Sequence, residues 1–273
     1  MSQTENEMEE AREGTIADPV KPLPSKVSEV KEQLHLKKSW RDYLFEFTVP
    51  FLAVTAAFLL NAERENYIDR QLEEEYVNSM IEDLELDTAY MNTRKKFIQI
   101  TIHRLDTLIK YLQNPDSKTI HKIYNSSSGF MYAGPIFRAN DRTLQQLKNT
   151  GGLRLIRNKS ISDRIVIYDR KIIENIMFQE AAIENARNNC KDIFGEILEV
   201  GALQQLFASD FDLLMPSAKV TLITNDRVTI NKFLSRLFAL RLLYSNAERN
   251  SYNAGLEYCG DFIYALQKEK SGS

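Results

Sequence analysis

The longest uncharged apolar run of the chain lies near its N-terminus. Residues 47–60 carry no charge, and the run extends back to Tyr43 with Glu46 as its one charged interruption. A helix over the 18 residues 43–60 would measure about 27 Å, close to the roughly 30 Å hydrocarbon core of a bilayer. Pro50 is tolerated in a membrane helix and costly in a soluble one. The pattern predicts a transmembrane helix over 39–62.

The residues that flank this run are typical of a membrane interface. Trp40 and Tyr43 precede it, Tyr67 follows it, and Glu46 lies where its carboxylate reaches headgroups or water. Basic residues gather upstream of the run, and only two occur between it and residue 82; the upstream ones are Lys21, Lys26, Lys31, Lys37, Lys38 and Arg41. The positive-inside rule predicts a cytoplasmic N-terminus and an extracytoplasmic C-terminal part.

Residues 1–38 show no apolar period. Residues 1–20 hold six acids and one base, and three prolines follow between positions 19 and 24. We expect a disordered, acidic cytoplasmic tail. A docking role for a partner protein is the alternative.

Helical periodicity dominates residues 63–268. Between residues 63 and 112 the chain has no Gly or Pro, and nothing separates this helix from the membrane run. Its apolar positions recur in steps of three, four or seven; they include Ile68, Leu72, Tyr76, Met80, Leu84, Met91, Ile98, Ile102, Leu105, Ile109 and Leu112. We expect one continuous helix that ends at the Asn-Pro-Asp turn of residues 114–116.

Two further long helices are expected. One begins at the capping motif of residues 160–163 and ends near Val200; the other is capped by Asn225 or Asp226 and ends near Gln267. The first has an apolar seam in two heptad positions: Ile165, Ile172, Ala186, Ile193 and Val200 in one, and Ile176, Ile183, Cys190 and Ile197 in the other.

The expected fold is all-α. A short helix over about 140–151 joins the three long helices in an elongated antiparallel bundle, with an irregular connection over 113–139 and a disordered C-terminus over 269–273. In such a bundle Cys190 and Cys259 lie too far apart along the axis to form a disulfide.

A structural turn is expected at Gly151 and Gly152, where the short helix ends. Leu153 and Ile156 follow, and we expect both to be buried so that they hold the turn against the long helices. An anion site at the two glycines, helped by nearby arginines, is the alternative.

Three segments resemble a family of bacterial single-pass membrane proteins of unknown function. They are the end of the apolar run at residues 61–64, the acidic helix 72–87, and the helix and turn of residues 143–156. The resemblance implies an N-terminal transmembrane helix followed by an extracytoplasmic helical domain in the bacterial inner membrane. It implies no activity and no catalytic residues.

Patterns that carry chemistry are scarce. The one Glu-x-x-His motif, at residues 32–35, lies in or beside the tail, and a di-iron bundle needs two. The chain has no glycine-rich phosphate loop and no Gly-x-Ser-x-Gly elbow. Acidic residues on 72–87 are expected to form a solvated face, with cation binding as the alternative. We expect no enzyme activity, cofactor or metal.

Two functions fit this pattern. The first is a single-pass membrane-anchored interaction or sensory module, whose partners are the lipid bilayer and either another protein or a second copy of the chain. The second is a soluble helical scaffold whose run of residues 47–60 is buried in a core or an oligomer interface. A net charge of −3 argues against nucleic acid as a partner.

Overall fold

The computed structural model describes residues 40–208 and 219–272. Within these ranges the regular elements are helices, together with one isolated β-bridge between Leu198 and Leu222. The expectation of an all-α fold is therefore confirmed. The chain divides into two compact units, residues 1–63 and 64–273. The expected tail over 1–38 lies outside the described residues.

Eight α-helices and three short helical segments make up the described part of the chain. In order they are α1 (Trp40–Gln113), α2 (Ile120–Met131), α3 (Arg142–Asn149), the 3-10 turn η1 (Gly152–Arg154), α4 (Lys159–Ile167), the π-helix η2 (Tyr168–Ile173), α5 (Glu174–Phe194), α6 (Val200–Ala208), α7 (Arg227–Ala247), the π-helix η3 (Glu248–Tyr252) and α8 (Asn253–Gly272).

Three boundaries differ from the expectation. Residues 120–131 form α2 because Ile123, Tyr124 and Phe130 are fully buried there, and this burial outweighs the turn signal of the Ser-Ser-Ser-Gly run. The second long helix ends at Phe194, before Gly195 and a separate α6. Residues 269–272 are helical, not disordered, because α8 continues without a break.

In the first unit, residues 40–63 belong to α1, and no other described residues cover their apolar side chains. Phe47 is 77% exposed and Phe58 is 72% exposed. The prediction that Tyr43–Leu60 form one helix with an uncovered apolar surface is confirmed. Among the described residues, no other segment buries residues 47–60.

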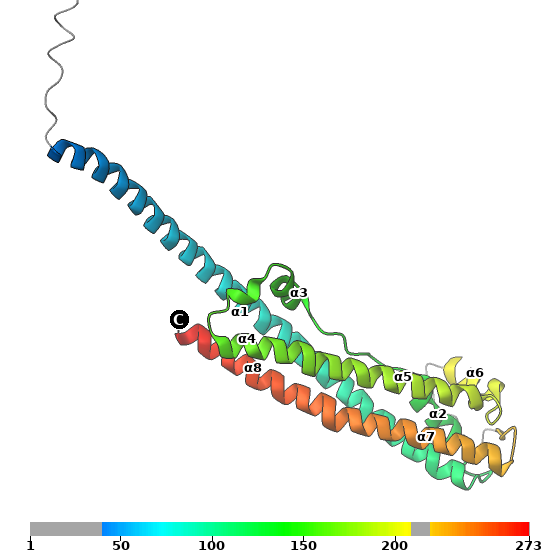
Figure 1. The fold of residues 1–273 in the computed structure, drawn as a ribbon. Helices are drawn as coiled ribbons and strands as arrows, with labels where there is room; N and C mark the ends of the chain where they lie inside the picture. Colours follow the sequence, from blue (N-terminus) through cyan, green and yellow to red (C-terminus); the bar gives the residue numbers. More distant parts are fainter. Residues whose placement is uncertain (1–39, 209–218, 273) are drawn as a thin grey trace, which may run out of the picture. The chain divides into compact units, whose positions relative to one another are not determined.

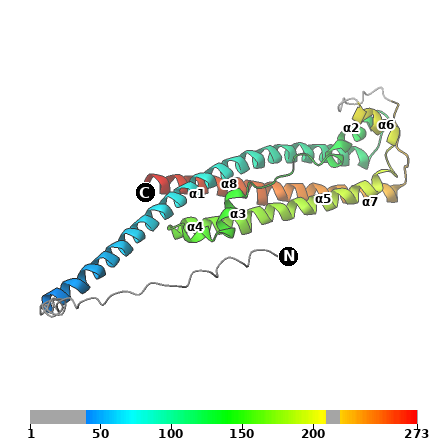
Figure 2. The same cartoon turned by 90° about the horizontal axis from the view of Figure 1, so that it is seen from above.

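The second unit is an elongated bundle of three long helical segments (Figure 1). From residue 64 onward α1 runs beside α4–α5 in the same direction, and α7–α8 returns against both (Figures 1 and 2). Gln99 bonds Glu248, and Asp106 bonds Arg241, as antiparallel neighbours do. Because residues 114–158 cross back along the bundle, only α7–α8 is antiparallel to its neighbours.

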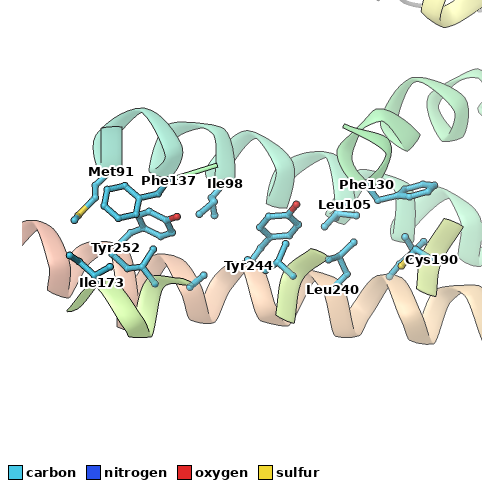
Figure 3. Close-up of a cluster of buried hydrophobic side chains, with 14 of the residues drawn as sticks. Met91, Ile98, Leu105, Phe130, Phe137, Ile173, Cys190, Leu240, Tyr244 and Tyr252 are labelled. Atoms are coloured by element: carbon cyan, nitrogen blue, oxygen red, sulfur yellow. The ribbon is translucent and has the colours of Figure 1, made fainter. Parts of the chain in front are cut away.

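The core of the second unit follows a strict heptad seam on α1. Apart from Asp83, the buried positions alternate in steps of three and four: Val77, Met80, Leu84, Asp87, Met91, Arg94, Ile98, Thr101, Leu105, Leu108 and Leu112. Figure 3 shows Met91, Ile98 and Leu105 facing Tyr252, Tyr244 and Leu240 across the core.

The predicted seam of the second long helix is right for one heptad position and partly right for the other. Ile176, Ile183, Cys190 and Ile197 are all buried, and so are Ile165 and Ile193 of the other set, whereas Ile172 and Ala186 are only partly buried and Val200 is 58% exposed. From η2 onward a further set of buried residues lies one position later than the predicted one; it comprises Ile173, Glu180, Arg187 and Phe194. The π-helix η2 causes this shift, because it adds one residue to the helical repeat.

Candidate functional site

The feature that stands out in the core is a buried ion pair between α1 and α5. Arg94 is 2% exposed, and its Nε and Nη2 atoms donate to the two carboxylate oxygens of Glu180 at 2.7 and 2.6 Å. Its Nη1 donates to the carbonyl oxygen of Ala133 at 2.7 Å. All three nitrogens of this guanidinium therefore have a partner inside the bundle.

Aromatic side chains surround this ion pair. The Tyr252 hydroxyl donates to Glu180 Oε1. The Arg94 guanidinium carbon lies 5.5 Å from the ring centre of Phe97 and 6.0 Å from that of Tyr244. Burial acts to lower the pKa of Arg94, but the hydrogen bonds and the charge of Glu180 outweigh it, and the pKa is raised. The Arg94 guanidinium therefore stays charged inside the bundle.

A second polar cluster lies one heptad earlier on α1. Asp87 is fully buried and accepts hydrogen bonds from the backbone N–H of Asn140 at 2.7 Å and from its side-chain amide at 3.0 Å. The Tyr168 hydroxyl donates to its other oxygen. Burial raises the pKa of Asp87, and these hydrogen bonds oppose the rise in part.

Each π-helix supplies a tyrosine to one of the two buried carboxylates. Tyr168 begins η2 and bonds Asp87, whereas Tyr252 ends η3 and bonds Glu180. The two π-helices lie near each other, since Ser251 of η3 donates to Asn175 just after η2 at 2.5 Å. Single π turns inside α-helices are frequent at functional sites. We call the set Asp87, Arg94, Tyr168, Glu180, Tyr244 and Tyr252 the polar hub.

Acidic residues of α1 also fix the segment that carries α3 and the turn after it. Glu73 accepts from the backbone N–H of Arg157 at 2.6 Å, and Asp83 accepts from that of Thr143 at 3.0 Å. With Asp87 and Asn140, three carboxylates thus hold three backbone N–H groups of residues 140–157. The expectation of a solvated acidic face is wrong for Asp83 and Asp87, because backbone donors from another segment cover them.

The predicted turn after α3 is present. Gly151 has a φ of +66°, in the left-handed region that favours glycine, just past the end of α3. Gly152 is buried, and a Cβ on it would come within 3.1 Å of Leu147. Ile156 is buried at 6% exposure, and Leu153 is half-buried against the core. Burial is therefore confirmed for Ile156 and only in part for Leu153.

Two backbone amides that follow the glycines are bonded within the turn itself. The backbone N–H of Arg154 donates to Gly151 O at 3.3 Å, and that of Leu155 donates to Gly152 O at 2.9 Å. The Arg157 side chain points to α1, where its Nε lies 3.7 Å from a Glu73 oxygen. The turn serves the packing of residues 140–157.

The predicted membrane-interface residues are all on α1 and all exposed. Trp40, Tyr43 and Tyr67 are 72%, 61% and 62% exposed, and Glu46 is also exposed. Tyr67 accepts a hydrogen bond from the side-chain amide of Gln71 at 2.9 Å. The membrane contact of these residues stays a prediction.

The two cysteines are free and buried, as expected. Burial raises the pKa of each thiol to about 12. Among the described residues, no three His, Cys, Asp or Glu side chains are grouped so that they could hold a metal ion.

Sequence reasoning missed the polar hub. The apolar stripe of α1 runs from Leu84 to Met91 to Ile98, and a search for apolar periodicity passes over the charged residues between them. Asp87 and Arg94 lie seven residues apart on the same seam of α1. Charged residues at positions that the heptad repeat assigns to the core are the one sequence signal that points to the hub. Glu180 lies 86 positions from Arg94, and nothing in the sequence links the two residues.

The hub is built to hold helices in register. Each of its carboxylates accepts three hydrogen bonds from other segments of the chain. Comparisons of this chain with protein-family models, with curated proteins and with solved structures find no match.

Proposed function

We propose that this chain is a single-pass membrane protein whose helical bundle, outside the cytoplasm, acts as a non-catalytic interaction or sensory module. One observation carries the proposal. The most apolar 18-residue window of α1 has a mean hydropathy of 1.8, and none of it is buried. Such a surface on one helix is costly in water and is satisfied by lipid.

The charge pattern supports an orientation. Six basic residues lie between positions 21 and 41, just before the apolar run, and two follow it before residue 82, which favours a cytoplasmic N-terminus. The bundle would then lie in the periplasm or outside the cell, as the family resemblance also implies. Two residues of the polar hub, Asp87 and Arg94, belong to the same helix as the apolar run, so in this proposal α1 carries both the span and part of the hub.

A soluble scaffold is the second candidate. The other described residues leave residues 47–60 uncovered, which favours the form of this candidate in which these residues make an interface between copies of the chain. The same apolar surface would be covered by lipid in the first candidate and by a second copy of the chain in the other. The membrane protein should stay in a membrane pellet, whereas the soluble scaffold should not.

The deciding experiment is a carbonate wash of membranes that contain the full chain. We expect the chain to remain in the pellet. The double variant Leu52→Arg with Ala56→Arg should lose membrane retention, because each arginine near the bilayer centre costs about 2.5–3.5 kcal/mol. Release of the unaltered chain by the wash would refute the anchor and favour the scaffold.

A matched control uses the same helix. The double variant Leu86→Arg with Tyr90→Arg has the same spacing, and both side chains are about half exposed, at 51% and 55%. It should stay in the pellet. If both double variants were released equally, the effect would come from added charge and not from a span.

Protease treatment of intact spheroplasts tests the orientation. We expect the protease to digest the bundle and to spare the N-terminal tail. Digestion of the tail with protection of the bundle would show the opposite orientation.

A further inference from the structure

A small notch beside the polar hub has two buried polar atoms with no partner. Arg187 Nε and the Tyr244 hydroxyl have no hydrogen-bond partner of normal geometry among the described residues, although the Arg94 guanidinium is close enough to the hydroxyl to act on its pKa. Arg187 is 5% exposed and Tyr244 is fully buried. Both line the notch, together with Arg94, Ala133, Ile136, Glu180, Ile183 and Glu184.

Leaving such groups unpaired is costly. A buried donor without a partner costs about 1–3 kcal/mol. Buried polar groups in folded proteins are therefore almost always paired, with protein or with ordered water. Two orphan atoms that line one notch indicate an occupant that satisfies both.

The size of the notch restricts that occupant. Its volume is about 10 Å³, close to the roughly 10–15 Å³ that one water molecule needs. It is open to solvent at Ile136 and Glu184, whose side chains are about half exposed, at 51% and 43%. A single small molecule can therefore enter without unfolding, and a substrate-sized ligand cannot.

The charges around the notch favour a neutral occupant. Arg94 is neutralised by Glu180, and Arg187 pairs with Glu184 through its Nη2. A halide would meet donors on Arg187 and Tyr244, but it would also meet the carboxylate of Glu180 with no net positive charge to offset it. Water can accept from Arg187 Nε and donate to an oxygen that lines the same notch.

We propose that this notch is a binding site for one ordered water molecule, held by Arg187 Nε and the Tyr244 hydroxyl. The water completes the hydrogen bonding of the hub and links α5 to α7 beside the Arg94–Glu180 pair. This inference does not depend on the membrane anchor, because every group that carries it belongs to residues 64–273.

The test is a crystal structure of the full chain at about 1.5 Å resolution, with a second crystal soaked in sodium bromide. We expect one density peak within hydrogen-bond distance of both atoms, with the height of a water oxygen, and no anomalous signal from bromide there. An anomalous peak would show an anion site. An empty notch would show that the two groups tolerate being unpaired. Either result would overturn the proposal.

Two variants test which groups hold the water. Tyr244→Phe removes one of the two partners, and we expect the peak to lose at least half of its occupancy. Tyr264→Phe alters a tyrosine that is 69% exposed and should leave the peak unchanged. Full occupancy in Tyr244→Phe would mean that the hydroxyl does not hold the water.

Discussion

Arg94 and Glu180 form a two-pronged ion pair inside the bundle, with N–O distances of 2.7 and 2.6 Å between residues 86 positions apart in the chain. The side chains are 2% and 9% exposed, so neither charge is solvated by bulk water. The buried charge of each side chain is therefore compensated only while its partner is present.

Removing one member of this pair should destabilise the chain strongly. Arg94→Met leaves the Glu180 carboxylate buried and uncompensated, and we expect a loss of about 3–5 kcal/mol in the free energy of unfolding. Combining it with Glu180→Leu should recover much of the loss, because no buried charge remains. Urea unfolding of the full chain in detergent, followed by circular dichroism, measures both.

The exposed pair of Arg241 and Asp106 provides the control. Its side chains are 29% and 49% exposed, and Arg241→Met should cost about 0–1 kcal/mol. Equal losses for Arg94→Met and Arg241→Met would contradict the view that burial makes the first pair important.

The buried carboxyl of Asp87 should make stability depend on pH. Because burial raises its folded-state pKa above the ordinary value of 3.8, the folded chain binds this proton more tightly than the unfolded chain does. Its contribution to stability is therefore full below pH 3.8 and is lost as the pH rises through the folded-state pKa. Asp87→Asn removes this titration.

The measurement is the difference in free energy of unfolding between the unaltered chain and Asp87→Asn across pH 3–7. We expect the unaltered chain to lose stability relative to the variant as the pH rises. A difference that moves the other way would mean that the hydrogen bonds from Asn140 and Tyr168 outweigh the burial of the charge.

The two thiols should be unreactive in the folded chain. Burial raises the pKa of Cys190 and of Cys259 to about 12, so the reactive thiolate is scarce at pH 8. A thiol reagent should label neither residue in the native chain and both after denaturation under non-reducing conditions. A mapped bridge between the two cysteines in one chain would refute the helix pairing.

Truncations in the turn after α3 should differ in their cost. Ile156 is buried, and Ile156→Ala should cost about 2–5 kcal/mol. Leu153 is only half-buried, so Leu153→Ala should cost clearly less. Thermal melts of the full chain give both values, and the reverse order would show that the exposed fractions do not reflect how these residues pack.

Local signals in the sequence are sufficient for the long helices but not for α2 or α6. The apolar steps of three and four predict the long helices, and Asp226 caps α7 through the Thr229 N–H at 2.9 Å. The expected start of α4 is two residues late, because Asn158 accepts from Ser160 N and is itself the cap. Asn140 does not cap α3, since its amide groups are bonded to Asp87.

The π-helices leave a trace in the order of buried positions. The buried positions of α7 recur in steps of three and four, and this series continues through Ala247 to Ser251. A second series with the same steps begins at Tyr252 and continues along α8. The second series is shifted by one residue relative to the first. One inserted residue accounts for the break. The partners of the hub could not be predicted in this way, because Asp87–Tyr168 and Arg94–Glu180 join segments that no local pattern relates.

The order of the helices along the chain has a consequence for synthesis on the ribosome. The seam of α1 ends at Leu112, whereas the residues of α7–α8 that cover it extend to Leu266. Roughly 150 residues separate the two, which takes about 8–30 s at 5–20 residues per second. A helix forms within about 1 μs. The nascent α1 therefore waits with its apolar seam uncovered, and the rate at which this bundle assembles is set by translation.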